Sequence, residues 1–404
     1  MKKKTIFLAI IYFLFGIAMN LVHPITPGYT EWLQLSDFYY GLLFSMMSLG
    51  QVIGAVFFGR LSDKIGRLSL LVVGLFGYAF FQFCFGFWTQ SEVLILLFRL
   101  GSGFFSAAPH VLFLTFVPDL EKEEKPRARA FFLFTALYLL GSSLGYKIGG
   151  LLFVHTTLSY FGVFLVQVIM VSSLAVLLAF SMRKENRVQV EGKKTPAPIG
   201  FRTFKKLGWK PCAFFLLLFL VATAQIMTTK FVEKYLYFLS YNEDDLGNMM
   251  MVTGLLGLLI NLIWSLVLQK KGGHYPRMYV GTLVVSSIAI FLTFLFGNQG
   301  FMIRIYTIYA VFIMAKSLSA PLEATMIQKM SGENSRGLYL GLRQSFLSLG
   351  NFIGPMIGGL LYGAHHLSVF FVSSGLFLFI AFLFFLLFGR EKEIITKENQ
   401  KEDC

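Results

Sequence analysis

Twelve long apolar stretches constrain this chain more than any other feature of its sequence. The hydrocarbon core of a bilayer is ~30 Å thick, so a spanning helix needs roughly 20 apolar residues. The predicted helices are Thr5–His23, Gly41–Gly59, Leu68–Trp88, Val93–Val117, Ala130–Val154, Leu158–Met182, Cys212–Leu236, Leu246–Leu268, Met278–Phe296, Phe301–Ile327, Leu338–Tyr362 and Leu367–Phe388. The number and length of these stretches exclude the buried helices of a soluble protein. The strands of an outer-membrane barrel would be shorter and would alternate polar with apolar residues. We therefore predict an all-α membrane protein.

The basic residues predict how the chain is oriented. Only 14% of residues are charged, yet the formal net charge is +14, with 35 Lys and Arg. Most of these basic residues fall in the connections on one side of the predicted helices, as the positive-inside rule requires of the cytoplasmic side. We expect both termini in the cytoplasm and a multi-pass location in the cell (inner) membrane. No basic domain with interleaved aromatic residues supports nucleic-acid binding.

Two related halves of six helices are predicted. The polar segment 183–210 divides the chain into 1–182 and 211–404, and 199–210 within it suits either a short helix on the membrane surface or a solvated linker. A row of glycines in helix 5 recurs with the same spacing in helix 11: Gly141, Gly145, Gly149 and Gly150, then Gly350, Gly354, Gly358 and Gly359. Weak internal symmetry is typical of a transporter whose halves move around a central site.

Polar residues form stripes on the first and fourth helices of each half, which we expect to line a central aqueous cavity. The alternative is that each polar group only holds helices together. The candidate residues are Tyr12, Asn20, His23, Arg99, Ser106, His110, Lys147, Gln225, Thr229, Glu233, Tyr309, Lys316, Glu323 and Arg343. Lys230 and Lys234 are expected to reach the membrane interface. The third and sixth helices of each half carry no charge and are expected to face lipid.

Glu323 is the deepest predicted acid, and we expect a cation such as Lys316 or Arg343 beside it. A carboxylate held between desolvation and a cation can exchange a proton, although a purely structural ion pair is an equal alternative. The stripes make the expected cavity net positive, which argues against strongly cationic substrates and is compatible with neutral, amphipathic or anionic compounds.

The connection after helix 2 reads Gly59-Arg-Leu-Ser-Asp63-Lys64-Ile-Gly66-Arg67 and resembles the signature of the major facilitator superfamily. This resemblance extends over essentially the whole chain and implies that family's fold. It also implies a latch between the halves, in which Gly59 permits close helix approach and Asp63 faces the N-terminus of helix 11. Arg67 would pair with Asp119.

Two further motifs resemble those of the twelve-helix bacterial drug:proton antiporters. Arg99-Leu-Gly-Ser-Gly103 is similar to an Arg-x-x-x-Gly motif, which implies that Arg99 assists proton transfer. The glycine row of helix 5 is similar to the antiporter motif, but Tyr146 stands where the family has proline. That proline appears in helix 11 instead, as Pro355. Unlike many of those antiporters, this chain has no acidic residue in helix 1 or 4.

The resulting expectation is proton-coupled export of small amphipathic compounds, with Glu323, Arg99 and Glu233 as the proton-coupling residues. The alternative is an organic-anion or metabolite carrier working by proton symport or exchange. An enzyme is not expected, because no convergent catalytic motif is present. No cofactor and no metal site are expected, since His365 and His366 stand alone in a short turn. The expected partners are a small-molecule substrate, protons and the bilayer, with the protein a monomer.

Overall fold

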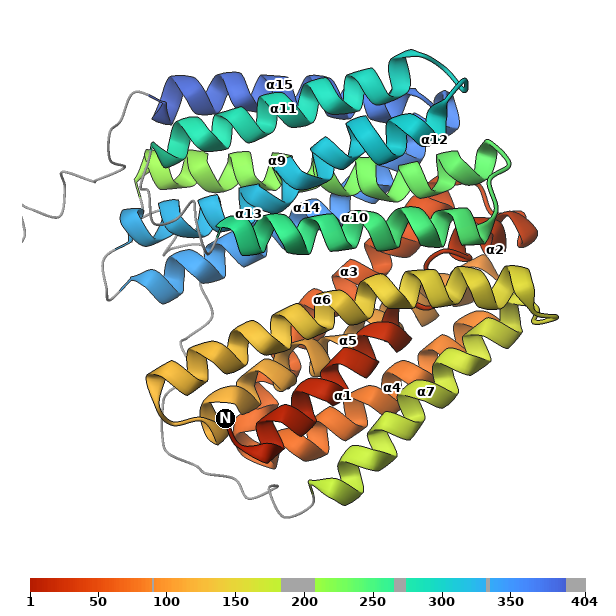
Figure 1. Cartoon of the computed structure of the whole chain (residues 1–404), viewed down its shortest axis with the longest axis vertical. Helices are drawn as coiled ribbons and strands as arrows, with labels where there is room; N and C mark the ends of the chain where they lie inside the picture. The colour runs from red at the N-terminus through yellow and green to blue at the C-terminus, as the bar shows by residue number, and fades with distance from the viewer. Residues whose placement is uncertain (89–90, 183–207, 265–273, 332–334, 390–404) are drawn as a thin grey trace, which may run out of the picture. The chain divides into compact units, whose positions relative to one another are not determined.

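The computed structural model describes residues 1–88, 91–182, 208–264, 274–331 and 335–389, and all regular structure in these ranges is helical (Figure 1). The elements in order are α1 (Lys3–Asn20), α2 (Thr26–Trp32), α3 (Asp37–Ile65), α4 (Arg67–Phe87), α5 (Glu92–Leu120), α6 (Glu124–His155), α7 (Tyr160–Ser181), α9 (Trp209–Phe238), α10 (Glu243–Ile263), α11 (Tyr275–Leu295), α12 (Phe301–Arg304), the π-helical turn η4 (Ile305–Tyr309), α13 (Ala310–Met330), α14 (Arg336–Ala364) and α15 (Ser368–Phe388).

The predicted twelve spans are confirmed. In the described part of the chain, twelve helices are long and apolar enough to cross a membrane, and α12, η4 and α13 together make one of them. Several boundaries move outward, because polar residues continue a helix beyond its apolar run. The span predicted from Gly41 begins at Asp37, where the hydroxyl of Ser36 accepts a hydrogen bond from the backbone N–H of Tyr39.

The short helix α2 was not predicted, since seven residues carry no spanning signal. It begins at Thr26, with Pro27 in its first turn, where the missing N–H of proline leaves no hydrogen bond unmade. The predicted surface helix at 199–210 and most of the linker 183–210 lie outside the described residues.

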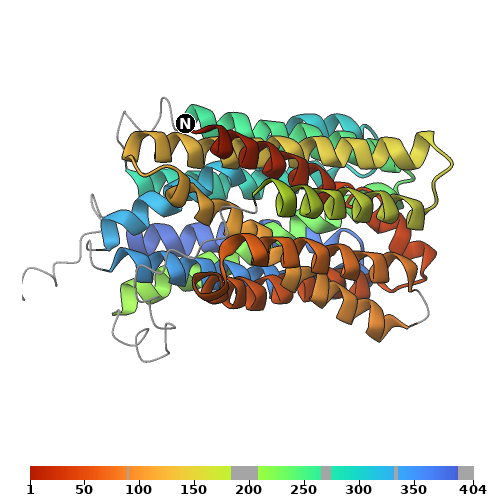
Figure 2. The ribbon, with the colours of Figure 1, turned by 90° about the horizontal axis from the view of Figure 1, so that it is seen from below.

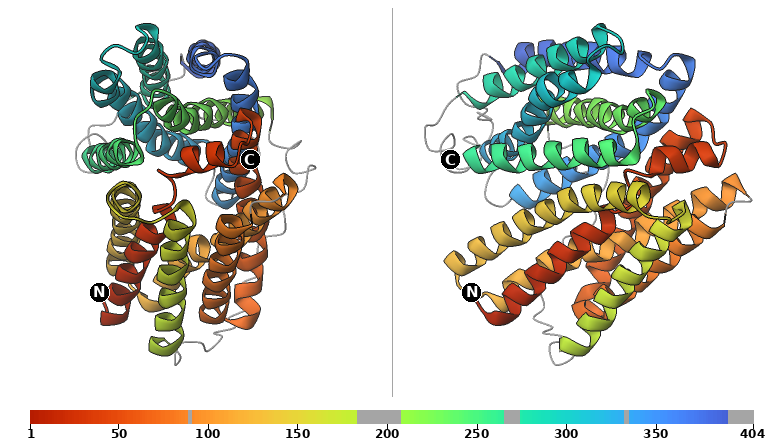
Figure 3. Two further views of the ribbon diagram at one scale, coloured as in Figure 1. Left: turned by 90° about the vertical axis from the view of Figure 1, so that its right-hand side faces the viewer. Right: turned by 45° about the vertical axis from the view of Figure 1, so that its right-hand side comes forward.

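The described residues group into two compact units. Those of Met1–Thr195 and Lys230–Leu255 form the first, and those of Pro196–Thr229 and Leu256–Cys404 form the second. In the first unit α1 lies along α6, α3 along α5, and α4 between α5 and α7; these neighbours can be followed in Figures 2 and 3. In the second unit α11 packs on α13 and α15. The third predicted span, α4, thus contacts the fourth and the sixth, α5 and α7. The ninth, α11, contacts the tenth and the twelfth, so the same neighbours occur in both units.

Large apolar side chains are distributed as in a membrane protein. Phe15, Tyr78 and Phe113 are fully buried in the core of the first unit. On the outer face of α7 Phe180 is 77% exposed, and Phe382 on α15 is 60% exposed. Exposed apolar patches of this kind would drive aggregation in water but are stable against lipid.

Candidate functional site

A buried carboxylate in the second unit joins three helices. Glu323 of α13 is 3% exposed, and its Oε2 lies 2.7 Å from Nη2 and 3.0 Å from Nε of Arg343 on α14. The hydroxyl of Tyr279 on α11 donates to Oε1 at 3.0 Å. Both donors of Arg343 therefore converge on one carboxylate oxygen, and Tyr279 occupies the other. Hydrogen bonds between ionised groups are stronger than those between neutral ones. Arg343 was one of the two cations expected beside Glu323, and Tyr279 was not anticipated.

The helix that carries Glu323 departs from regular geometry in two places. Pro321 lies inside α13, two residues before Glu323, and proline has no N–H to donate to the preceding turn. The π-helical turn η4 precedes α13 in the same span. Such turns are rare and occur frequently at functional sites.

Arg99 of α5 is a buried cation in the first unit. It is 3% exposed, and its guanidinium carbon lies 4.8 Å from the centre of the Phe85 ring. Its Nη1 lies 3.5 Å from Oε1 of Gln82, while its Nε has no hydrogen-bond partner. Gln82 in turn accepts from Ser102 and donates to Gln167 at 2.8 Å. Among the described residues Arg99 forms no ion pair.

Gln82 and Gln167 correct one expectation about the uncharged helices. They lie on α4 and α7, which were expected to face lipid, yet they are 1% and 0% exposed. Each of these helices therefore has one face buried in the bundle and one face turned outward. A lone Gln in an apolar helix was the available signal, because an amide in hydrocarbon needs a partner.

The lysines of α9 give a second correction. Lys234 does not extend into solvent: it is 3% exposed, and its Nζ lies 2.6 Å from Oδ1 of Asp37 at the start of α3. Lys230 pairs with Glu233 at 2.9 Å, three residues further along the same helix. Both lysines are thus held by acids, so a flexible surface position is excluded for them.

Lys147 of α6 also has an acidic partner. Its Nζ lies 2.6 Å from Oδ1 of Asp244 on α10. Asp244 had been assigned to a connection, whereas α10 begins at Glu243 and includes it. The positive surplus inferred from the sequence is therefore smaller by one charge, since Asp244 is an additional acid that neutralises Lys147.

The other stripe residues of the first unit are linked to one another. Asn20 donates to Ser142 at 3.0 Å, and Nε2 of His110 lies 2.9 Å from the hydroxyl of Tyr138, so both residues connect to α6. Ser106 accepts a hydrogen bond from Gln51 at 3.3 Å. Tyr12 is buried among aromatic rings.

In the second unit the stripe continues along α9 and α13. Gln225 donates to the hydroxyl of Ser319 at 3.4 Å, and the Thr229 hydroxyl donates to the backbone carbonyl of Gln225 at 2.9 Å. Tyr309 is buried in η4, and Lys316 is half-buried on α13. The polar stripes are therefore present as hydrogen-bonded faces in each unit.

Residues of the predicted latch are described in part. Arg67 forms an ion pair with Asp119 and also donates to the backbone carbonyl of Thr115. Gly66 has φ of 103°, a left-handed conformation that favours glycine and permits the tight turn from α3 to α4. Among the residues that the structure describes, no atom lies within 4 Å of where a Cβ of Gly59 would stand. The side chain of Asp63 lies outside what is described, and that of Lys64 is exposed.

The glycine rows bring helices close together. In the first unit Gly141, Gly145 and Gly149 of α6 face backbone atoms of α1 or of the residue after it. In the second unit Gly350 and Gly354 of α14 face α9 in the same way. Gly150 differs, since it faces the backbone of Glu243. Pro355, Gly358 and Gly359 are buried in α14.

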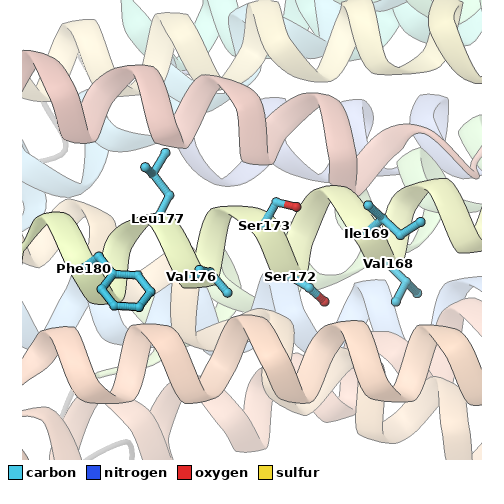
Figure 4. Close-up of a pocket in the computed structure, with 7 residues that line it drawn as sticks. All are labelled: Val168, Ile169, Ser172, Ser173, Val176, Leu177 and Phe180. Carbon is cyan, nitrogen blue, oxygen red and sulfur yellow. The ribbon is translucent and has the colours of Figure 1, made fainter.

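A shallow hollow on α7 contains none of the predicted site residues. Figure 4 shows its lining, which comes from one helix: Val168, Ile169, Ser172, Ser173, Val176, Leu177 and Phe180. Several of these side chains are exposed and apolar. The hollow is therefore a lipid-facing surface of α7 and gives no reason to move the candidate site.

Twelve candidate spans and charged side chains buried within them define the class as a polytopic membrane transporter. The family model of the Major Facilitator Superfamily matches residues 8–314 and 239–403. The chain belongs to that superfamily.

Similar proteins include Multidrug resistance protein 1 of Bacillus subtilis (strain 168), at 27% identity over 377 residues. Quinolone resistance protein NorA of Staphylococcus aureus (strain MSSA476) is 25% identical over 377 residues. Each alignment covers 90% of this chain and 91% of the relative. The resemblance to drug-resistance efflux proteins is thereby confirmed.

Two solved structures support the fold. A bacterial homologue of the human lysosomal transporter Spinster, inward-facing and occupied, aligns with a TM-score of 0.74 at 16% identity, over 96% of both chains. A structure of the nucleoside transporter NupG aligns with a TM-score of 0.75 at 15% identity, over 95% of this chain and 99% of that one.

Proposed function

We propose that this protein exports small amphipathic compounds across the cell membrane in exchange for protons, by alternating access. The buried Glu323 carboxylate, held by Arg343 and Tyr279, carries this proposal. Relatives named for multidrug and quinolone resistance support the export of drug-like compounds. We place both termini in the cytoplasm and the protein in the membrane as a monomer.

In the proposed mechanism Glu323 takes up a proton from the outer side. Protonation removes the negative charge that holds Arg343, so the contact between α13 and α14 weakens. Glu233 and its partner Lys230 form a second acid–base pair on α9 and belong to the same proposed route. Arg99 keeps its charge and, as the family motif implies, assists proton transfer.

The conformational change itself is assigned to the latch. The motif from Gly59 to Arg67, with Asp119, stabilises one state of the halves 1–182 and 211–404. The polar stripes line the substrate path. Differential binding of protons and substrate to the two states couples their movements.

A second candidate is an organic-anion carrier that works by proton symport or exchange. The observation that favours it is Arg99, a buried cation with no ion pair among the described residues. The two candidates differ in direction, because an exporter lowers the cellular concentration of its substrate and a symporter raises it.

Growth of an efflux-deficient bacterial host tests the proposal. Cells expressing the protein are challenged with cationic, neutral and anionic toxic compounds, beside cells expressing Glu323→Gln. The exposed acid Glu124 supplies the matched control, Glu124→Gln. We expect resistance to neutral or anionic compounds that is lost with Glu323→Gln and kept with the control. Increased sensitivity to anions would favour the carrier, and resistance unaffected by Glu323→Gln would contradict the proton role.

A further inference from the structure

Arg99 stands out among the buried cations of the first unit. Lys147 and Lys234 each lie 2.6 Å from a carboxylate oxygen, and Lys230 lies 2.9 Å from one. Arg99 is as buried as Lys234 and more buried than Lys147 and Lys230, yet its best polar contact is a 3.5 Å approach to the amide oxygen of Gln82. Burying an ion without a counter-ion is unfavourable, because the lost hydration is not replaced. Ionisable residues within membrane spans mark the pathways of substrates or ions.

The side chains around Arg99 combine aromatic surface with unmet hydrogen-bonding capacity. The guanidinium lies over the rings of Phe85 at 4.8 Å and Phe44 at 5.9 Å. His23 follows the C-terminal end of α1, and its imidazole stacks with the ring of Phe44, with 6.3 Å between ring centres and 11° between planes. Within the described ranges, both Nε of Arg99 and Nδ1 of His23 are buried without a hydrogen-bond partner. Two nitrogen atoms from α5 and the end of α1 are thus available beside one aromatic ring.

The charge of this cluster suits a single negative charge. Lys230 lies over Phe44 at 4.6 Å, but Glu233 neutralises it. One positive charge, that of Arg99, remains. A guanidinium binds a carboxylate through parallel N–H···O hydrogen bonds, and its Nε–H is one of the donors used for this. Phe44 and Phe85 offer apolar faces to the body of the molecule that bears the carboxylate.

We propose that Arg99, assisted by His23 beside the Phe44 ring, binds the carboxylate of an amphipathic monoanion during transport. This inference rests on the proposed export of small amphipathic compounds and names the substrate group that the protein recognises. Arg99 and Phe44 are 3% and 5% exposed, so the carboxylate reaches them when the surrounding helices separate.

Binding to purified protein tests this without a proton gradient. The probes are a quinolone carboxylic acid that lacks a basic amine, and its methyl ester, which has the same ring system without the charge. Wild-type protein should bind the acid about tenfold more tightly than the ester, as expected for charge-assisted hydrogen bonds. In Arg99→Gln the preference should disappear while affinity for the ester stays the same, which also shows that the variant is folded.

Two further variants complete the comparison. Lys329→Gln removes one positive charge at an exposed position of α13 and should keep the full preference for the acid. Arg99→Lys keeps the charge but loses the paired donors, so it should bind the acid several-fold more weakly with ester affinity unchanged. If Arg99→Gln loses ester binding, Arg99→Lys decides the question.

Three results would overturn the proposal: no binding of the acid to wild-type protein, equal affinity for acid and ester, or a preference that survives both Arg99 substitutions. This binding test can fail or succeed independently of the proposed proton-driven export. An Arg99-dependent preference in a protein that shows no proton-driven transport would keep the carboxylate site and refute proton coupling.

Discussion

At the scale of single residues, the ion pair of Glu323 and Arg343 makes a stability prediction. Replacing Arg343 by Gln leaves a buried carboxylate with only Tyr279 as a described partner, and breaking a buried pair costs about 3–5 kcal/mol. The double variant Glu323→Gln with Arg343→Gln removes both charges. We expect thermal unfolding in detergent to show a large loss for the single variant and a smaller one for the double variant. A double variant as unstable as the single one would show that the charges are not coupled.

The site could be predicted from sequence only where a charge interrupts an apolar stretch. Glu323, Arg343 and Arg99 stand out in this way, because ionised groups are rare in hydrocarbon. Tyr279, Gln82 and Gln167 carry no charge and stand out less: the isolated Gln in each of α4 and α7 is a signal only that the amide needs a partner, and Tyr279 is one of several uncharged polar residues of α11. The pairing of Lys147 with Asp244 depends on where α10 begins, and helix ends are the least certain part of a sequence-based prediction.

At the scale of elements, the glycine row of α6 predicts a steric limit. A Cβ at Gly145 would meet the backbone of Ile17, which cannot move without moving α1. We expect Gly145→Leu to separate α1 from α6 and to lower the yield and melting temperature of folded protein. Gly281→Ala on α11 is the control, since no atom lies within 4 Å of its added Cβ, and Ala is favoured in a helix by roughly 0.5–1 kcal/mol. Equal behaviour of the two variants would contradict close packing as the reason for the row.

A second prediction at this scale concerns the start of α1. Glu121, just after α5, accepts hydrogen bonds of 2.7 Å from the backbone N–H of Lys2 and from the Thr5 hydroxyl. These hydrogen bonds hold the pKa of Glu121 below its usual value. Because the folded pKa lies below the unfolded one, about 4.3, the contact stabilises the protein above that pH. The stabilisation is lost as pH falls through the folded pKa.

We therefore expect Glu121→Gln to lower the melting temperature at neutral pH. The difference from wild type should shrink as the pH is lowered through the acidic range, where wild-type Glu121 becomes protonated too. Glu124→Gln, at an exposed position, should show no such dependence. A difference that stays constant from neutral to acidic pH would show that the charge of Glu121 does not stabilise α1.

The spans themselves were largely predictable, because the thickness of the bilayer sets the minimum apolar length that every spanning helix needs. What the sequence could not reveal is which helices pair. The glycine spacing in helices 5 and 11 indicates close packing but not the partner, and the structure identifies α1 and α9 as the partners. The helix α2 escaped prediction because it is too short to span a membrane and has no apolar run.

At the scale of the whole molecule, ion pairs connect segments that lie far apart in the chain. Asp37 at the start of α3 pairs with Lys234 of α9, and Lys147 pairs with Asp244, all within the first unit. If transport requires these contacts to form and break, single charge reversals such as Lys147→Asp should reduce transport about tenfold or more. The swapped pair Lys147→Asp with Asp244→Lys should recover part of it. Transport rates are compared at equal protein levels in the membrane. A swapped pair that transports no faster than either single variant would count against this role.

The central claim is that a proton gradient drives export through Glu323. Its most direct test is transport by purified protein in liposomes, with an imposed pH gradient and a fluorescent amphipathic probe. We predict that the gradient drives accumulation of the probe by wild-type protein, that collapsing it stops accumulation, and that Glu323→Gln binds the probe without accumulating it. Accumulation that ignores the gradient, or that survives Glu323→Gln at the wild-type rate, would contradict the account.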